Sequence, residues 1–546
     1  MGAGRRCPSR SVPQHHGNEG HSSQTGSRLV GQNDLVTPES LTRTLEDYLV
    51  GSSGGVVLED GVIAFDLARA KFSISGEHNK CLLHFWSAER NVVRRVLDAE
   101  VKNGTLRLAV QRLGQSRPTR IEICRDPDRR SPSSKRAARM AYQHKLRRCL
   151  ERHWPDLAVV HMTTGANLEK SFGPVYARGL MRHGRSAFAV LGVNELETQG
   201  SIDAALTFGI LWLDECRRAQ AAKSVVEGLN LIVPAGRSSA LIRERMAGLS
   251  RGAAKWALYE FNESHDALAE LDCSDRGNVR TRLGHAFDHA VVLQRFASSI
   301  AQVQAVTPHC EIAVLSAGEI AFRWRGLAFA HARFATDDAS FRPEQEIVFG
   351  SEPRLLDSTS EPDFRDFAAR LGEIRHPYGP KQHPLWKMVP ERWLESVVAA
   401  DVNMLDDRFN PSCVYGQVPA FSAADRAMID ILTCTRSNRL VVIELKADED
   451  IHLPLQGLDY WSRVAWHHER GEFLKFGYFP GVHLSAQKPQ LILVAPSLHV
   501  HPATDTLLRY ISSEVEWELI GLAEHWREEV KVVFRKHPHD RHAPAA

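Results

Sequence analysis

Short apolar runs alternate with polar turns along most of the chain, and this pattern predicts a mixed α/β protein of several domains. In residues 428–445, an apolar and β-branched run is followed by the turn-like segment Arg436–Arg439 and by a second apolar run. Two strands joined by a tight turn are expected here. Because side chains alternate between the faces of a strand, Glu444 and Lys446 should project to the same side. The hairpin should bring Asp430 back beside Glu444.

Two carboxylates and an ammonium group are thus predicted at one end of a buried sheet. Such a cluster is costly in an apolar setting unless a further charge pairs with it. A divalent cation satisfies this need, because Mg²⁺ takes oxygen ligands, keeps several waters and accepts substrate phosphate. The pattern therefore indicates phosphodiester hydrolysis with a bound metal, in which Lys446 orients the attacking water or stabilises the growing negative charge.

The segments Asp430, Glu444-Leu445-Lys446 and Gln456-Gly457-Leu458-Asp459-Tyr460 resemble the PD-(D/E)xK nuclease superfamily. The likeness is to the branch with a Gln-x-x-x-Tyr element, which includes RecB-type nuclease domains and mismatch-type endonucleases. It covers roughly residues 390 to 496 and somewhat beyond. Ile429 stands where the family name has proline, a substitution that is frequent in the superfamily. The resemblance implies a restriction-endonuclease-like mixed sheet flanked by helices, Mg²⁺ or Mn²⁺ as cofactor and DNA as substrate, with RNA left open.

The resemblance also implies roles for particular residues. In the family a glutamate on the helix before the motif completes the metal site, and here Glu395 is preferred over Glu391 in a helix that opens at Pro390. Gln456 and Tyr460 should lie on the following helix and contact the nucleic-acid backbone or the active site. The expected catalytic set, of which the first three residues bind metal, is Asp430, Glu444, Glu395, Lys446, Gln456 and Tyr460.

Composition narrows the class of protein. The 546 residues, 43% hydrophobic and 25% charged, are typical of a folded chain of two to four domains, and the net charge of only +2 requires any nucleic-acid site to come from local charge asymmetry. Nine cysteines without a Cys-x-x-Cys pair indicate reduced thiols in a cytoplasmic protein rather than a zinc or iron–sulfur site. We see no apolar run of membrane-spanning length, no secretory signal and no phosphate-binding loop.

Changes in pattern predict an α/β C-terminal nuclease domain preceded by β-rich and α+β domains. The expected divisions are a disordered tail (1–40), a β-rich module (41–125), a basic helix with an α/β module (126–245), an α+β module (246–352), a linker (353–389), the nuclease domain (390–536) and a histidine-rich tail (537–546). Nothing in the pattern decides the oligomeric state.

A basic segment, 125–152, carries ten Lys or Arg residues against three acids. Its latter part can form a helix with Met140, Leu146 and Leu150 as an inner stripe. Such a surface could neutralise phosphates without reading sequence, although a solvated helix or linker explains the same pattern. The candidate nucleic-acid-binding residues are Arg136, Arg139, Lys145, Arg147 and Arg148.

The segment Ser186–Gly236 repeats the strand, acidic link, helix and strand order that follows Leu440. One hypothesis is that residues 140–245 form a degenerate second copy of the nuclease fold, in which Gly192 and Asn194 replace the glutamate and lysine. Two unrelated strand–helix–strand units remain the alternative.

Three functions compete at this point. The first is a metal-dependent DNA nuclease acting in repair or in defence against foreign DNA. The second is a catalytically inactive nucleic-acid-binding or assembly protein that keeps the nuclease scaffold. The third is a hydrolase of another kind that uses the same carboxylates, for which the sequence offers no nucleophile or base set.

Overall fold

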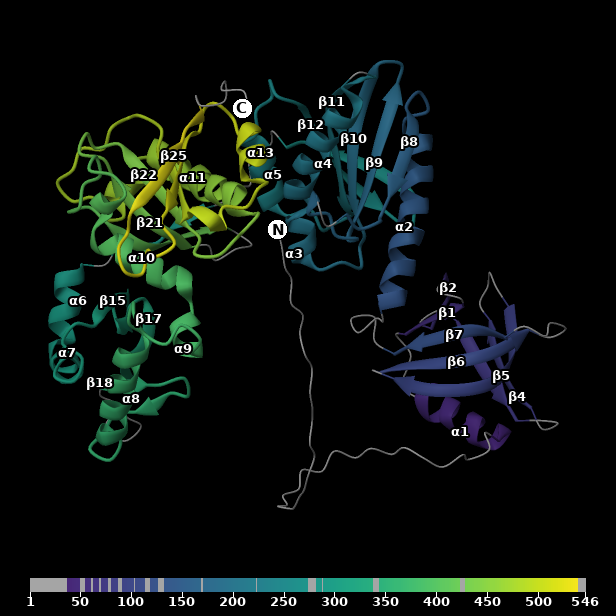
Figure 1. Ribbon diagram of the computed structural model, residues 1–546, viewed down its shortest axis with the longest axis horizontal. Coiled ribbons are helices and arrows are strands. Elements are labelled where there is room, and N and C mark those ends of the chain that lie inside the picture. The colour runs from purple at the N-terminus through teal and green to yellow at the C-terminus, as the bar shows by residue number, and fades with distance from the viewer. Residues whose placement is uncertain are drawn as a thin grey trace, which may run out of the picture. The chain divides into compact units, whose positions relative to one another are not determined.

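The protein is described from a computed structural model. The described residues are 37–49, 55–59, 62–67, 70–76, 80–86, 91–102, 104–112, 118–125, 132–167, 170–221, 223–273, 281–286, 288–336, 343–422 and 428–538. The chain forms two compact units, Met1–Lys135 and Arg136–Ala546 (Figure 1). Most of the two predicted tails, residues 1–36 and 539–546, lies outside the described residues, but the first helix begins at Pro38, inside the predicted N-terminal tail.

The first unit contains a seven-stranded antiparallel sheet, as the β-rich pattern predicts. Its order is β2-β1-β7-β6-β5-β4-β3. The strands are β1 (Val56–Glu59), β2 (Val62–Asp66), β3 (Lys71–Ser75), β4 (Cys81–Trp86), β5 (Asn91–Lys102), β6 (Thr105–Arg112) and β7 (Pro118–Cys124). Helix α1 (Pro38–Leu49) packs Leu45 and Leu49 into the same core as the inward-facing residues of the sheet.

The long helix α2 (Pro132–His153) starts in the last residues of the first unit and lies mostly in the second, where a six-stranded mixed sheet of order β13-β12-β11-β10-β9-β8 follows it. We call residues 136–273 the first α/β domain. Its strands are β8 (Ala158–Thr163), β9 (Tyr176–His183), β10 (Ser186–Val193), β11 (Val225–Pro234), β12 (Lys255–Asn262) and β13 (Ala267–Leu271). Its other helices are α3 (Gln199–Asp203), α4 (Ala205–Gln220) and α5 (Ala240–Ala247).

A seven-stranded mixed sheet of order β14-β20-β21-β22-β23-β24-β25 lies at the C-terminal end of the chain. We call it and its helices the C-terminal α/β domain. Its strands are β14 (Thr281–Leu283), β20 (Tyr415–Ser422), β21 (Met428–Cys434), β22 (Leu440–Leu445), β23 (Gln490–Pro496), β24 (Glu516–Leu522) and β25 (Val532–Lys536). Its helices are α10 (Pro390–Ala400), η3 (Val402–Met404), α11 (Leu453–Glu469), α12 (Glu472–Lys475), η4 (Ser497–His499) and α13 (Thr504–Arg509).

The two α/β domains share one topology. Strands β8 to β13 and strands β20 to β25 follow the same order, and each sheet has the same two parallel pairs, formed by its third, fourth and fifth strands. The remaining pairs are antiparallel in both sheets. Helices α4 and α11 cross from the third strand to the fourth, and α5 and α13 cross from the fourth to the fifth. One arrangement therefore occurs twice in the chain.

A separate antiparallel sheet of five strands lies between these domains in sequence. It comprises β15 (Glu311–Ser316), β16 (Glu319–Trp324), β17 (Leu327–Thr336), β18 (Pro343–Phe349) and β19 (Arg354–Leu355), with helices α6 (His289–Arg295), α7 (Ala297–Gln304), α8 (Glu361–Ile374) and α9 (Pro384–Lys387). The prediction of a linker over 353–389 is wrong, since α8 buries Phe364 and Leu371 in this module's core. The prolines misled the prediction because proline is well tolerated at the first turn of a helix, where α8 and α9 both carry one.

Helix α2 confirms only part of the predicted apolar stripe. Leu146 and Leu150 are buried, whereas Met140 is 47% exposed. The buried face is continued instead by Ala138 and Tyr142. Residues spaced by four lie on one face of a helix, and Met140 is two residues from each of these, so its side chain points elsewhere.

No helix in the described ranges is both long enough and apolar enough to cross a membrane. The eight cysteines within those ranges are free thiols.

Candidate active site

The predicted hairpin is present as β21 and β22. The antiparallel register pairs Ile431 with Ile443, so the next residues outward, Asp430 and Glu444, lie side by side on the face of the sheet that α11 covers. The Asp430 Oδ2 atom accepts a hydrogen bond from the backbone N–H of Leu445 at 3.0 Å. Alternation along the two strands thus brings the predicted carboxylates together.

Glu444 is the most enclosed acid of the cluster, with 1% of its surface exposed. The Lys446 Nζ atom donates to Glu444 Oε1 at 3.1 Å. The second oxygen, Oε2, is buried and has no hydrogen-bond partner among the described residues. Burial raises the pKa of Glu444 well above its usual value, and the neighbouring Asp430 charge raises it further.

Lys446 carries the positive charge of the cluster and is itself buried. Burial alone would lower its pKa, but the carboxylates of Glu444 and Glu391 outweigh this effect and raise it. The Nζ atom lies 3.6 Å from Glu391 Oε2. The lysine therefore stays protonated at neutral pH, in reach of two acids.

Helix α10 supplies two glutamates, one turn apart on the same face. Glu395 is buried, and its Oε2 accepts from Arg392 Nη1 at 2.7 Å and from Gln417 Nε2 at 2.8 Å. Burial raises the pKa of Glu395, and Asp430 raises it further. Glu395 also lines a cavity of about 450 Å³. The glutamate whose carboxylate faces Lys446 is Glu391, which the sequence analysis placed second; Glu395 lies beside Asp430 but is held by Arg392 and Gln417.

Gln456 and Tyr460 lie one turn apart on α11, as predicted. Gln456 Nε2 donates to the Tyr460 hydroxyl at 3.2 Å. Burial raises the pKa of Tyr460 to about 12, and the negative charge of Glu444 adds to the effect. The phenol is consequently neutral at physiological pH and remains a hydrogen-bond donor next to the acids.

The acids of this cluster fit a hydrated magnesium ion. No group of three or more His, Cys, Asp and Glu side chains that could hold a metal ion occurs in the part of the chain that the structure describes. Two carboxylates suffice for Mg²⁺, which keeps several waters and often takes only one or two protein carboxylates. The pKa values of Glu444, Glu391 and Glu395 are all raised, chiefly by burial, and Asp430 raises each of them further. A cation beside Asp430 and the partnerless Glu444 Oε2 would relieve this repulsion.

Two residues of the site were missed by the sequence analysis, Arg392 and Gln417. Gln417 follows Gly416 in β20, and its φ of 54° lies in the left-handed region that residues other than glycine rarely adopt. This strained conformation accompanies its hydrogen bond to Glu395. No motif marks the position, because the contact arises only when β20 pairs with β21.

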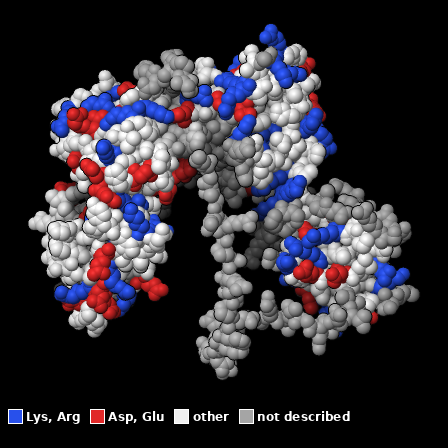
Figure 2. Space-filling view, in the orientation of Figure 1, with Lys and Arg blue, Asp and Glu red and all other residues white. Residues whose placement is uncertain are grey.

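The basic residues predicted on α2 are largely neutralised by acids. Arg139 forms a two-pronged pair with Glu197, and Arg147 pairs with Glu151. Lys145 lies 3.6 Å from Glu263. Of the five candidate residues, Arg136 and Arg148 are exposed and form no salt bridge with the residues that the structure describes. The pairs with Glu197, Glu151 and Glu263 mean that α2 is not a uniformly basic surface. Figure 2 shows lysine and arginine in several separate places on the face drawn, with acidic side chains among them.

Comparison of the chain with protein-family models, with curated proteins and with solved structures found no match. The chemistry of the cluster is therefore the basis for assigning a function.

Proposed function

We propose that the C-terminal α/β domain is a metal-dependent nuclease that hydrolyses phosphodiester bonds of DNA, in repair or in defence against foreign DNA. One observation carries the proposal: Asp430, Glu444 and Lys446 meet at the ends of adjacent strands, with a buried carboxylate oxygen that lacks a partner among the described residues. Charged groups buried together at such cost are concentrated at functional sites.

Asp430 and Glu444 are the residues that would hold Mg²⁺ or Mn²⁺. A bound ion supplies a water of lowered pKa and offsets charge on the phosphate. Lys446, whose pKa is raised by the adjacent carboxylates, holds a fixed positive charge beside this position. Its ammonium group can orient the attacking water and stabilise the charge that grows on the phosphoryl oxygens.

The hydrolysis needs only water and the phosphodiester as reactants. The water oxygen forms a bond to phosphorus while the bond from phosphorus to one sugar oxygen breaks, and that oxygen takes up a proton. The water's other proton passes to solvent. The Gln456 amide and the Tyr460 hydroxyl, which lie side by side on α11, would donate to a non-bridging phosphate oxygen and so position the strand.

A non-catalytic DNA-binding or assembly protein is the second candidate. The observation that favours it is that Glu395 and Glu444 are already paired with Arg392 and Lys446. In that case Lys446 would simply neutralise Glu444, and metal would not be required.

The test is the Lys446→Ala variant. We expect cleavage of DNA in Mg²⁺ to fall by about 10²–10³-fold or more, because a preorganised positive group is lost from the transition state. The protein should still fold, because burial raises the pKa of Glu444 and the carboxyl can be protonated once the ammonium is lost, and most DNA binding should remain. Lys488→Ala is a matched control, since Lys488 is half exposed and pairs only with the exposed Glu514. Undiminished cutting by Lys446→Ala would reject the assignment.

A second measurement separates the two candidates. DNA binding is measured with and without Mg²⁺, alongside cleavage of single- and double-stranded DNA and RNA. Binding that is independent of metal, with no cut product under Mg²⁺ or Mn²⁺, would favour the non-catalytic scaffold.

A further inference from the structure

The two α/β domains pack against each other through reciprocal contacts. Helix α5 packs on α11, and the equivalent pair, α13 on α4, packs in the same way. Just after α5 and α13, Leu249 and Ile511 form an isolated antiparallel bridge. Ser250 N–H donates to Tyr510 O at 2.8 Å, and Ser512 N–H donates to Gly248 O at 2.9 Å. Contacts that exchange equivalent elements in this way define an approximate two-fold axis within one chain.

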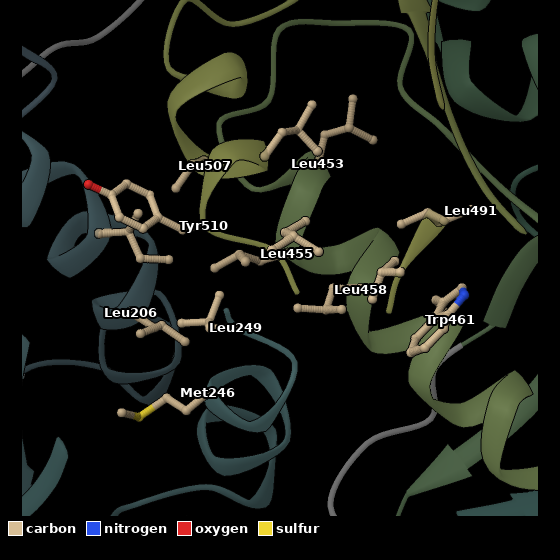
Figure 3. Close-up of a cluster of buried hydrophobic side chains, with 14 of the residues drawn as sticks. Leu206, Met246, Leu249, Leu453, Leu455, Leu458, Trp461, Leu491, Leu507 and Tyr510 are labelled. Atoms are coloured by element: carbon tan, nitrogen blue, oxygen red, sulfur yellow. The ribbon is translucent and has the colours of Figure 1, made fainter. Parts of the chain in front are cut away.

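An apolar core crosses this boundary. Figure 3 shows Leu206, Met246 and Leu249 of the first α/β domain facing Leu455 and Leu458 on α11. A Cβ atom added at Gly248 would lie 2.9 Å from Leu458, so the glycine permits the close approach. The two domains therefore share one hydrophobic core, as the halves of a stable dimer do.

Two helix glycines align the domains residue by residue. Gly209 of α4 lies against Leu229 and Leu231, and a Cβ there would be 2.7 Å from Leu229. Gly457 of α11 lies against Leu491 and Leu493, with Leu493 the nearer. The strands that carry these leucines end at Pro234 and Pro496, three residues after Leu231 and Leu493, so Leu231 is equivalent to Leu493. In the two sheets Leu231 pairs with Leu191 and Leu493 pairs with Glu444, so Leu191 is equivalent to Glu444. In the adjoining antiparallel pairs Arg178 lies opposite Leu191 as Asp430 lies opposite Glu444, so Arg178 is equivalent to Asp430.

This alignment corrects the sequence analysis by one residue. Gly192 faces α2, where a Cβ would meet Leu146 and Tyr142, and it is therefore on the wrong side of the sheet to replace Glu444. The residues of the first α/β domain that stand at the positions of Asp430, Glu444, Lys446, Gln456 and Tyr460 are, in that order, Arg178, Leu191, Val193, Phe208 and Trp212.

The first α/β domain has a cation where the second has its acids. The Arg178 guanidinium is buried, 4.5 Å from the Phe172 ring and 5.5 Å from the Trp212 ring, and it donates to Gly165 O. A fixed positive charge flanked by leucine and valine repels a divalent ion. The pseudo-dimer consequently offers one hydrolytic centre.

We propose that this chain cuts one strand of duplex DNA at each encounter and leaves a nick. The inference rests on the proposed function. The strands of a duplex are related by two-fold axes, so a two-fold protein with two active halves can place one centre on each strand. Here the C-terminal α/β domain makes its two-fold contact with the first α/β domain, which has Arg178 at the position of Asp430. A second copy of the chain cannot use the same surface to supply another centre.

The experiment uses the full-length protein and negatively supercoiled plasmid in Mg²⁺. We expect the open circle to form first and to account for at least about nine-tenths of the early product, with linear DNA appearing only after many nicks. At equal consumption of the supercoiled form, the ratio of open circle to linear DNA should not change with protein concentration. Linear DNA as the first product, or a rise of linear DNA with protein concentration at equal consumption of the supercoiled form, would overturn the inference.

Failure of this inference can be told apart from failure of the proposed function. Linear duplex and single-stranded DNA are tested in parallel, with Lys446→Ala as the inactive control. If these are degraded while the closed plasmid stays intact, the nuclease proposal stands and nicking is overturned. If no substrate is cut in Mg²⁺ or Mn²⁺, the nuclease proposal fails, and nicking fails with it.

Discussion

The two α/β domains have the same strand order and opposite chemistry at the same place. Both rely on a glycine in the crossing helix, Gly209 or Gly457, which lets that helix lie close on two leucines of the sheet. Where the C-terminal domain has Asp430 and Glu444, the first domain has Arg178 and Leu191. Topology is thus set by apolar residues and close-packing glycines, whereas chemistry depends on a few side chains at one end of the strands.

The reciprocal interface is also unequal in its ion pairs. Between α5 and α11, Arg245 and Asp459 form a buried, two-pronged pair, with the closest atoms 2.7 Å apart. Between α4 and α13, Arg509 lies 3.2 Å from Asp214 but is 53% exposed. Buried pairs couple strongly to stability once one partner is removed, while exposed pairs contribute little. The backbone contacts and the apolar packing at this interface therefore follow the two-fold symmetry, whereas the ion pairs do not.

Arg245→Ala should cause the largest loss of stability at this interface. It leaves Asp459 buried without its guanidinium, at a cost of about 3–5 kcal/mol. Arg509→Ala, the control on the other side of the axis, should cost less than about 1 kcal/mol, because Arg509 is half exposed and the buried Asp214 keeps its contacts with Arg218 and the Tyr510 hydroxyl. Urea unfolding followed by tryptophan fluorescence measures both. Equal losses would show that burial does not distinguish the two pairs.

Mg²⁺ should stabilise the C-terminal α/β domain and should have no effect on the first α/β domain. The pKa of Glu444 is raised in the folded state, so its contribution to stability is fully present below the unfolded value of 4.5 and is lost as pH rises through the folded pKa. Mg²⁺ binding requires the deprotonated acid, and its stabilising effect should therefore grow as pH rises from 5 to 8. At a free concentration a hundred times the dissociation constant, the gain is about 2.7 kcal/mol.

Thermal unfolding with Mg²⁺ or with a chelator, at several pH values, checks this expectation. Glu444→Gln removes the titrating group and should both flatten the pH dependence and abolish the Mg²⁺ effect. Arg178→Lys, at the position of Asp430 in the first domain, should leave the Mg²⁺ effect unchanged. A metal effect that persists in Glu444→Gln would place the ion elsewhere.

Local patterns predicted the elements of the C-terminal domain well. The hairpin of β21 and β22, the helix that opens at Pro390 and the helix that carries Gln456 and Tyr460 all appear where apolar runs and turn residues indicated them. Alternation in the strands was enough to bring Asp430, Glu444 and Lys446 together, because the residues are close along one hairpin.

Long-range pairing limited the rest of the prediction. The expected boundary at residue 246 separates β11 from β12, although the two strands are parallel neighbours joined through α5. The alignment on Gly192 was one residue out, and in a strand one residue reverses the face. The choice between Glu391 and Glu395 depended on Gln417, whose strand, β20, meets the site only in three dimensions.

Tyr460 and Trp212 offer the finest comparison between the two domains, because they occupy equivalent places on α11 and α4. Tyr460→Phe removes a hydroxyl that lies beside the acids and accepts from Gln456, and we expect DNA cleavage to fall by roughly 10-fold, the effect of losing about one hydrogen bond to a charged group. Trp212→Phe removes the indole N–H that donates to Gly179 O at 2.8 Å, so it should lower stability while cleavage per folded molecule stays unchanged. Single-turnover cleavage rates, normalised to the folded fraction, measure both effects. An equal loss of rate in both variants would mean that Tyr460 acts through packing alone. An unchanged rate in Tyr460→Phe would show that its hydroxyl does not position the strand.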